Sequence, residues 1–244
     1  TDADCTFYPG WLHTIASFYQ QYKPSFIAAP VAFTNENSFL KIFQSLDFLS
    51  LQGITGASVY KKFHSMCNGA NLAYEKKAFE KADGFSGIDH IASGDDMLLM
   101  HKIYKEDPSR VLYLKSGEAV VCTQPAETTA EFFQQRIRWA SKAGMYEDKR
   151  IFFVLLLVYL FNFSLFVLLV YSFFNVDYFY WFTGIMLFKT FVELVFLYPV
   201  AGFFNKKKLL WFFLPSQPFH ILYTVIAGFL GQITTYEWKG RKVK

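Results

Sequence analysis

Residues 151–174 read IFFVLLLVYLFNFSLFVLLVYSFF, and tyrosine is the only ionisable side chain in this run. A helix rises about 1.5 Å per residue, so a helix over the whole run would be about 36 Å long. The hydrocarbon core of a bilayer is about 30 Å thick. The run therefore predicts a membrane-spanning helix in this part of the chain.

A second apolar run, residues 178–204, is also long enough to cross a bilayer, but it contains Lys189 and Glu193. Side chains four residues apart lie on the same face of a helix. An isolated charge is costly in hydrocarbon, so we expect the two to pair or to face the interior of a helix bundle. A structural ion pair and a place on a substrate path are both open.

A third apolar run, residues 209–234, is interrupted by the stretch LPSQPFH at 214–220. Pro215 and Pro218 each lack a backbone N–H and bend a helix. We therefore expect this segment to begin as an interfacial or re-entrant piece. The chain is expected to have two or three membrane helices, at about 151–174, 178–204 and 209–234.

The composition changes sharply along the chain. Of its 244 residues 53% are hydrophobic and 20% are aromatic, and residues 1–150 carry nearly all the acidic side chains. The change near Arg150 predicts two parts. We expect a soluble domain over residues 1–148 and a membrane region over residues 149–244 that ends in a basic tail.

Basic residues flank the predicted spans unevenly. Five precede the first span, three follow the second, and the turn between these spans has none; the eight are Arg136, Arg138, Lys142, Lys149, Arg150, Lys206, Lys207 and Lys208. Because cytoplasmic loops carry an excess of Lys and Arg, we expect an integral membrane protein of a bacterial inner or plasma membrane with its soluble domain in the cytoplasm. The net charge of +4 at these edges indicates contact with anionic membrane lipids, and no nucleic-acid partner is expected. The basic tail EWKGRKVK conflicts with a complete third crossing, so its side of the membrane stays open.

The soluble part alternates between helical and strand-like patterns. We expect helices over 10–22, 38–50 and 128–144, the last with a threonine cap, and strands over 24–33, 110–114 and 118–124. Residues 67–85 predict a glycine-containing turn followed by a strand and a helix. Strands mixed with helices indicate a layered α/β domain.

Asp2 and Asp4 stand one residue apart in the opening stretch TDADCTFY. At a strand end or in a tight turn, alternate side chains can point the same way and converge on a hard divalent cation. A turn with two solvated acids is the alternative.

A second acidic pair, Asp95 and Asp96, follows Gly94 and precedes a helical pattern. The pair could cap that helix, favoured by the positive end of the helix dipole. Alternatively, one carboxylate could act as a general base and take a proton from an acceptor hydroxyl.

The stretch QQRIRW at 134–139 places Gln135, Arg138 and Trp139 on a helix just before the first predicted span. An arginine can hold diphosphate oxygens with two parallel donors, and an indole face can stack on a sugar ring. An amphipathic helix at the membrane surface, with its tryptophan at the interface, is the alternative.

Together and in this order, DAD, NGAN, GDD and QQRIRW resemble the motifs of the membrane-bound family-2 glycosyltransferases, which include cellulose-, chitin- and hyaluronan-synthase-like members. The resemblance extends over essentially the whole chain. It implies an α/β fold: part of a GT-A-like (Rossmann-like) catalytic domain followed by an all-α transmembrane region. Because family members have a nucleotide-binding half before their DxD motif, we expect the sequence to be a C-terminal part of a longer chain and to be inactive by itself.

The resemblance also implies roles for the acidic residues. Asp4, with Asp2 nearby, matches the residues that engage a Mg or Mn ion bound to the nucleotide diphosphate. Asp96 matches the base that activates the acceptor hydroxyl. Asp95 stands where the family usually has glutamate, which leaves the assignment of the catalytic pair open.

Further roles are carried over from the family motifs. Gln135 and Arg138 are expected to contact the diphosphate or the transferred sugar of the donor. Residues expected at the acceptor are Trp139, Asn68, Gly69 and Asn71.

The implied activity is transfer of a sugar from a nucleotide-sugar donor to a lipid or polysaccharide acceptor, with inversion and without a covalent enzyme intermediate. Two alternatives remain: a membrane scaffold with a degenerate transferase domain, and a channel or transporter that uses Lys189 and Glu193. The sequence leaves open which sugar, nucleotide and acceptor are used, and whether transfer repeats.

Overall fold

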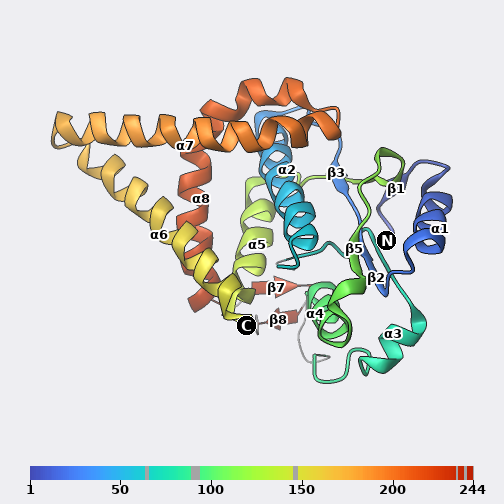
Figure 1. Ribbon diagram of the computed structural model, residues 1–244. Coiled ribbons are helices and arrows are strands. Elements are labelled where there is room, and N and C mark those ends of the chain that lie inside the picture. The colour runs from blue at the N-terminus through green and yellow to red at the C-terminus, as the bar shows by residue number, and fades with distance from the viewer. Residues whose placement is uncertain (64–65, 89–93, 145–147, 235, 239–240, 244) are drawn as a thin grey trace. The chain divides into compact units, whose positions relative to one another are not determined.

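The computed structural model describes residues 1–63, 66–88, 94–144, 148–234, 236–238 and 241–243 (Figure 1). Lys239, Gly240 and Lys244 of the predicted basic tail lie outside the described residues. The chain divides into two compact units. The first comprises residues 1–37, 47–125 and 203–205, and the second comprises residues 38–46, 126–202 and 206–244.

The first unit contains two small mixed sheets. One has the order β1 (Thr6–Phe7), β6 (Val121–Thr123) and β3 (Val31–Phe33). In it β6 is antiparallel to β1 and parallel to β3. The other has the order β4 (Leu72–Tyr74), β2 (Phe26–Ala28) and β5 (Val111–Tyr113). In it β2 is antiparallel to β4 and parallel to β5. Strands β2 and β3 are buried throughout, which explains their nearly continuous apolar sequence. The run expected as one strand over 24–33 is therefore two strands in different sheets.

The helices of the first unit follow the predicted pattern. They are α1 (Trp11–Tyr22), most of α2 (Phe39–Tyr60), α3 (Lys76–Lys81) and α4 (Asp95–Glu106), with short 3₁₀ turns η1 (Pro108–Arg110) and η2 (Gly117–Ala119). Helix α1 ends at Lys23, which adopts the left-handed conformation that closes many helices. Ile15 of α1 joins Ile27 of β2 and Leu114 in one buried apolar cluster. Helix α1 thus shares a hydrophobic core with the β4-β2-β5 sheet.

Helix α2 is ten residues longer at its C-terminal end than the sequence predicts, because it continues from residue 50 to Tyr60. Gly53 and Gly56 lower helix propensity in this part. A side chain at Gly56 would place its Cβ atom 3.2 Å from the ring of Tyr113, so the glycine permits close packing on β5. Tertiary contacts here outweigh local propensity.

The second unit is mainly helical. It contains the start of α2, α5 (Thr129–Ala140), η3 (Ser141–Gly144), α6 (Lys149–Tyr171), α7 (Val176–Phe203), η4 (Lys207–Phe212) and α8 (Phe213–Ile233), and a two-stranded ribbon of β7 (Tyr236–Trp238) and β8 (Arg241–Val243). The expected threonine cap is present, since the Thr128 side chain accepts a hydrogen bond from the backbone N–H of Glu131 and the Glu131 side chain accepts one from the backbone N–H of Thr128. Helix α8 packs against α5 and α6. Gly228 and Gly231 make this contact close: an added Cβ would come within 2.8 Å of Tyr159 and of Ala140 respectively.

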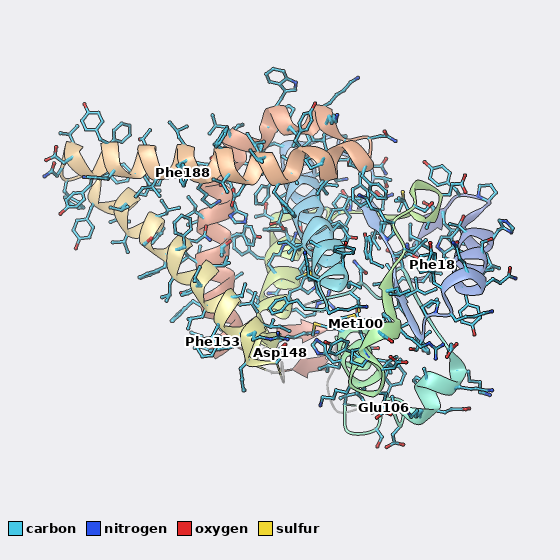
Figure 2. The ribbon with its side chains drawn as sticks, viewed as in Figure 1. Phe18, Met100, Glu106, Asp148, Phe153 and Phe188 are labelled. Carbon is cyan, nitrogen blue, oxygen red and sulfur yellow. The ribbon has the colours of Figure 1, made fainter. Side chains whose placement is uncertain are left out.

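Three segments of this unit are long and apolar enough to cross a membrane: Lys149–Tyr171, Val176–Phe203 and Lys207–Ile233. Their bounds lie within three residues of the predicted ones. Figure 2 labels Phe153 of α6 and Phe188 of α7, whose side chains are 64% and 69% exposed, as expected for surfaces that face lipid. The division at residue 148 and the number of helices that cross stay predictions.

Two prolines inside helices are accommodated differently. Pro215 lies in the first turn of α8, where a backbone donor is not needed, and Pro218 lies inside the helix. The stretch 214–220 lies within α8, and the 3₁₀ turn η4 precedes it; an interfacial or re-entrant start of this segment stays a prediction. Pro199 inside α7 was not considered in the sequence analysis.

Candidate functional site

The first acidic pair lies in a tight turn before β1. The backbone N–H of Cys5 donates to the carbonyl oxygen of Asp2 at 3.2 Å, and the Thr123 hydroxyl on β6 donates to Asp4 Oδ2 at 3.0 Å. Ligand atoms of Asp2, Asp4 and Cys5 lie within 4.8 Å of one another. Two exposed carboxylates suit Mg²⁺ or Mn²⁺, whereas a thiolate is a softer ligand that Mg²⁺ does not favour. The carboxylates therefore fit the predicted ion, and Cys5 was not expected beside them.

The second acidic pair lies in the first turn of α4. The helix cap is Gly94, whose positive φ of 92° suits glycine, so neither aspartate is the N-cap residue. Asp95 is exposed and Asp96 is half-buried. Asp96 Oδ1 accepts the N–H of Met97 at 2.8 Å, and Asp96 Oδ2 accepts the N–H of Gly69 at 2.7 Å. These two bonds fix the orientation of the Asp96 carboxylate.

The NGAN stretch forms the turn that faces Asp96. The Asn68 side-chain oxygen accepts a hydrogen bond from the N–H of Ala70 at 3.0 Å. The backbone carbonyl of Asn68 accepts one from the N–H of Asn71, also at 3.0 Å. The Asn71 side chain is fully buried and bonded within the protein through both its amide nitrogen and its oxygen. Asn68 and Gly69 are half-buried, so the accessible part of the turn is the part that meets Asp96.

The Cys67 thiol lies directly before this turn. Desolvation raises its pKa well above the ordinary value, and the negative charges of Asp96 and Asp95 raise it further. The thiol is therefore neutral at physiological pH. The Asp96 carboxylate that bonds to Gly69 thus also lies close enough to Cys67 to disfavour its thiolate.

The third motif lies on α5 in the second unit. Gln135, Arg138 and Trp139 are half-buried. Between them in sequence is Arg136, which is 4% exposed, and its guanidinium carbon lies 4.3 Å from the ring centre of Trp139 and 4.8 Å from that of Phe132. Such contacts between a guanidinium and aromatic faces are attractive.

Sequence reasoning treated Arg136 only as a flanking positive charge. Its contact with aromatic rings could have been inferred from the spacing, because aromatic residues stand four positions before it and three after it, on one face of the helix. Arg136 and Lys142 are both buried. The charge asymmetry that predicted a cytoplasmic domain therefore depends on the remaining basic residues.

The site residues are divided between the units. Asp2, Asp4, Asp95, Asp96 and the turn 68–71 belong to the first unit, and Gln135, Arg138 and Trp139 belong to the second. Within the first unit the structure brings Asp2 beside Asp4 and Asp96 beside Gly69. Convergence of both units on one saccharide stays a prediction.

A separate polar cluster lies among the apolar helices. Lys189 and Glu193 pair as expected, with 2.7 Å between Nζ and Oε1. Gln217 of α8 accepts from Lys189 Nζ at 2.6 Å and donates to Glu193 Oε2 at 2.8 Å. Because the three side chains bond to one another across two helices, the cluster favours a structural role over a transport path.

Residues 1–204 match the protein family described as "Glycosyl transferase family group 2". The matched region contains all four motifs that suggested this resemblance. No curated protein and no solved structure matches the chain. The match and the architecture together confirm the expected fold class, a GT-A-like α/β domain followed by a helical region with three membrane-capable helices.

Proposed function

The chain belongs to the family-2 glycosyltransferases, and from this premise we propose that it transfers a sugar from a nucleotide-sugar donor to a lipid or glycan acceptor, with inversion at the anomeric carbon. The observation that carries the proposal is the geometry of Asp96. At the start of α4 its carboxylate is held by the backbone N–H groups of Met97 and Gly69, beside the half-buried residues Asn68 and Gly69. A fixed, accessible carboxylate is what general-base catalysis requires.

In the proposed reaction Asp96 removes the proton of an acceptor hydroxyl. The oxygen of that hydroxyl forms a bond to the anomeric carbon as the bond from this carbon to the diphosphate oxygen breaks. The nucleoside diphosphate leaves with the bonding electron pair. Asp95, exposed beside Asp96, contributes negative charge to the same end of α4 and is the second member of the proposed catalytic pair.

Asp2 and Asp4 are the residues that would hold a divalent Mg or Mn ion. Such an ion, when bound, neutralises charge on the leaving diphosphate. The support for this assignment is the donor set, two carboxylates in one turn with a hydroxyl of β6 holding Asp4.

The α5 motif supplies the remaining proposed contacts. Gln135 and Arg138 bind the donor, because a guanidinium offers paired donors to diphosphate oxygens. Trp139 stacks on the acceptor sugar, with Arg136 against its ring. Asn68 and Gly69 lie at the acceptor end of the base.

We place the protein in a membrane, because three of its helices are long and apolar enough to cross one. The proposed location is a bacterial inner or plasma membrane, with the transferase domain on the cytoplasmic side and anionic lipids at its basic edges. An acceptor drawn from the membrane, or a growing glycan, suits this location.

The proposal is tested with the full-length protein in membrane vesicles. A panel of radiolabelled nucleotide sugars is supplied with Mg²⁺ or Mn²⁺, and products are identified by mass spectrometry. We expect one donor to give a glycosylated lipid or glycan and free nucleoside diphosphate. Absence of transfer from every donor by correctly folded protein, with ion or solute flux through the same vesicles, would favour a transporter instead.

A further inference from the structure

The turn that holds Asp96 is itself held by one buried side chain. Gly69 donates its N–H to Asp96 Oδ2 at 2.7 Å, so the position of this N–H depends on the shape of the turn 68–71. That turn is closed by the backbone N–H of Asn71, which donates to the carbonyl of Asn68 at 3.0 Å. Asn71 is fully buried and therefore cannot be a surface feature of the turn.

The Asn71 amide connects three other segments to the turn. Its Nδ2 donates to the carbonyl of Pro30, between β2 and β3, and to that of Ala119 in η2, each at 2.7 Å. Its Oδ1 accepts the indole N–H of Trp11 on α1 at 3.1 Å. Only an amide offers two donors and an acceptor on so short a side chain. Asparagine is thus matched to this position by its hydrogen bonds.

We propose that Asn71 is a positioning residue for the base: it fixes the turn whose Gly69 N–H orients the Asp96 carboxylate. The inference rests on the proposed function, because orientation of Asp96 matters for activity only if Asp96 is the base. Asn71 was expected at the acceptor, but its side chain is fully buried, so we assign it a role through Gly69 in place of contact with substrate. Trp11, 60 residues earlier in the chain, supports the same turn through Asn71 Oδ1.

Two consequences for catalysis follow. A base displaced from hydrogen-bonding reach of the acceptor hydroxyl works more slowly, and small displacements have large effects on rate. A backbone N–H that bonds to a carboxylate also favours its charged form. Loss of the Asn71 bonds should therefore lower the rate and move the acid limb of the pH profile to higher pH.

Two titratable groups among the described residues, Cys67 and Asp95, lie close to Asp96. Cys67 has a raised pKa and stays neutral over the acid limb. Asp95 is exposed on the same turn of α4. An Asp95→Asn variant measured in parallel shows how much Asp95 contributes to the acid limb of the pH profile.

The test compares Asn71→Ala and Trp11→Phe with the parent full-length protein in membrane vesicles. The measured quantities are kcat, donor KM and the pH dependence of transfer. For Asn71→Ala we expect kcat to fall by about tenfold or more, a donor KM within about twofold, and an acid limb at higher pH. Trp11→Phe removes one of the three bonds, keeps an aromatic ring, and should give a smaller change in the same direction.

Gln52→Met is the matched control. Gln52 is also buried in the first unit, and its Oε1 accepts the N–H of Val31, next to the residue that Asn71 binds. Its loss should lower stability without shifting the pH profile, because Gln52 bonds to Val31 of β3 and not to the turn 68–71.

Unchanged pH profiles in both Asn71→Ala and Trp11→Phe, with activity lost only in proportion to folded protein, would overturn the inference. If Asn71→Ala does not fold, Trp11→Phe decides. The Asp96→Asn variant separates the base assignment of Asp96 from the positioning role of Asn71. Full transfer by Asp96→Asn refutes the base assignment. No transfer by Asp96→Asn, with normal profiles in the Asn71 and Trp11 variants, refutes only the positioning role.

Discussion

The substitution Gln217→Leu tests whether the buried polar cluster stabilises the helical unit. Gln217 is 2% exposed and joins α8 to α7 by accepting from Lys189 Nζ and donating to Glu193 Oε2. Leucine has a similar volume and removes both bonds while leaving the Lys189–Glu193 pair. The change therefore isolates the contribution of the amide.

The expected magnitude follows from the number of bonds lost. Hydrogen bonds to charged groups contribute about 1.5–3 kcal/mol each in water-soluble proteins. Side-chain bonds between membrane helices average only about 0.6 kcal/mol and reach about 1.7 kcal/mol, because the unfolded chain in a membrane also finds partners. For two bonds between helices we expect Gln217→Leu to lower the free energy of unfolding by about 1–3 kcal/mol.

The assay is reversible unfolding of the purified protein by SDS in mixed micelles, followed by circular dichroism. Ser216→Ala is the control, since Ser216 is equally buried on α8 but its hydroxyl bonds only to the Phe212 carbonyl of its own segment. A double-mutant cycle with Lys189→Met should give a coupling energy of about 1 kcal/mol or more between Lys189 and Gln217. Equal stability of Gln217→Leu and the parent, or additive effects in the cycle, would contradict a structural role.

Three further predictions concern other parts of the chain. Thr128→Ala removes the capping box of α5 and should lower the free energy of unfolding by about 1 kcal/mol, measured by chemical denaturation against Thr129→Ala, which lies outside the box. Because the pKa of Cys67 is raised, its thiol should react with iodoacetamide much more slowly at pH 8 than a free thiol. Asp96→Asn removes one of the charges that raise this pKa and should speed the labelling. An unchanged rate would show that the Asp96 charge does not act on Cys67. Asp4→Asn removes a charged ligand and should raise the Mn²⁺ concentration needed for half-maximal transfer by about tenfold, whereas an unaltered metal requirement would exclude Asp4 from the ion site.

Much of the helical region could be predicted because its signal is local. The apolar runs placed three membrane-capable segments within three residues of their observed ends, since the length and composition of a segment indicate whether it can cross a bilayer. The pairing of Lys189 with Glu193 followed from helical spacing. Gln217 could not be found in this way, because it comes from the next helix and only tertiary packing brings it to the pair.

The α/β part was less predictable for the same physical reason. Helix α2 continues past residue 50 although Gly53 and Gly56 lower its propensity there, because Gly56 packs closely against Tyr113. The motifs identified Asp96 and the NGAN turn as separate signals, and the sequence did not show that the Gly69 N–H joins them. The burial of Asn71 was equally invisible, because its partners lie 41, 48 and 60 residues away.

The most direct measurement of the central claim is sugar transfer by Asp96→Asn in the full-length protein, compared with Asp83→Asn. Asp83 is an exposed aspartate with a positive φ of 57° in the same unit, a conformation that asparagine tolerates, so the control makes the same chemical change away from the proposed base. We expect Asp96→Asn to lower kcat by about 10²–10⁴-fold in protein that stays folded, with one of the two backbone N–H bonds lost because an amide has a single acceptor oxygen, and Asp83→Asn to retain the parent rate. Transfer at the parent rate by folded Asp96→Asn would contradict the account.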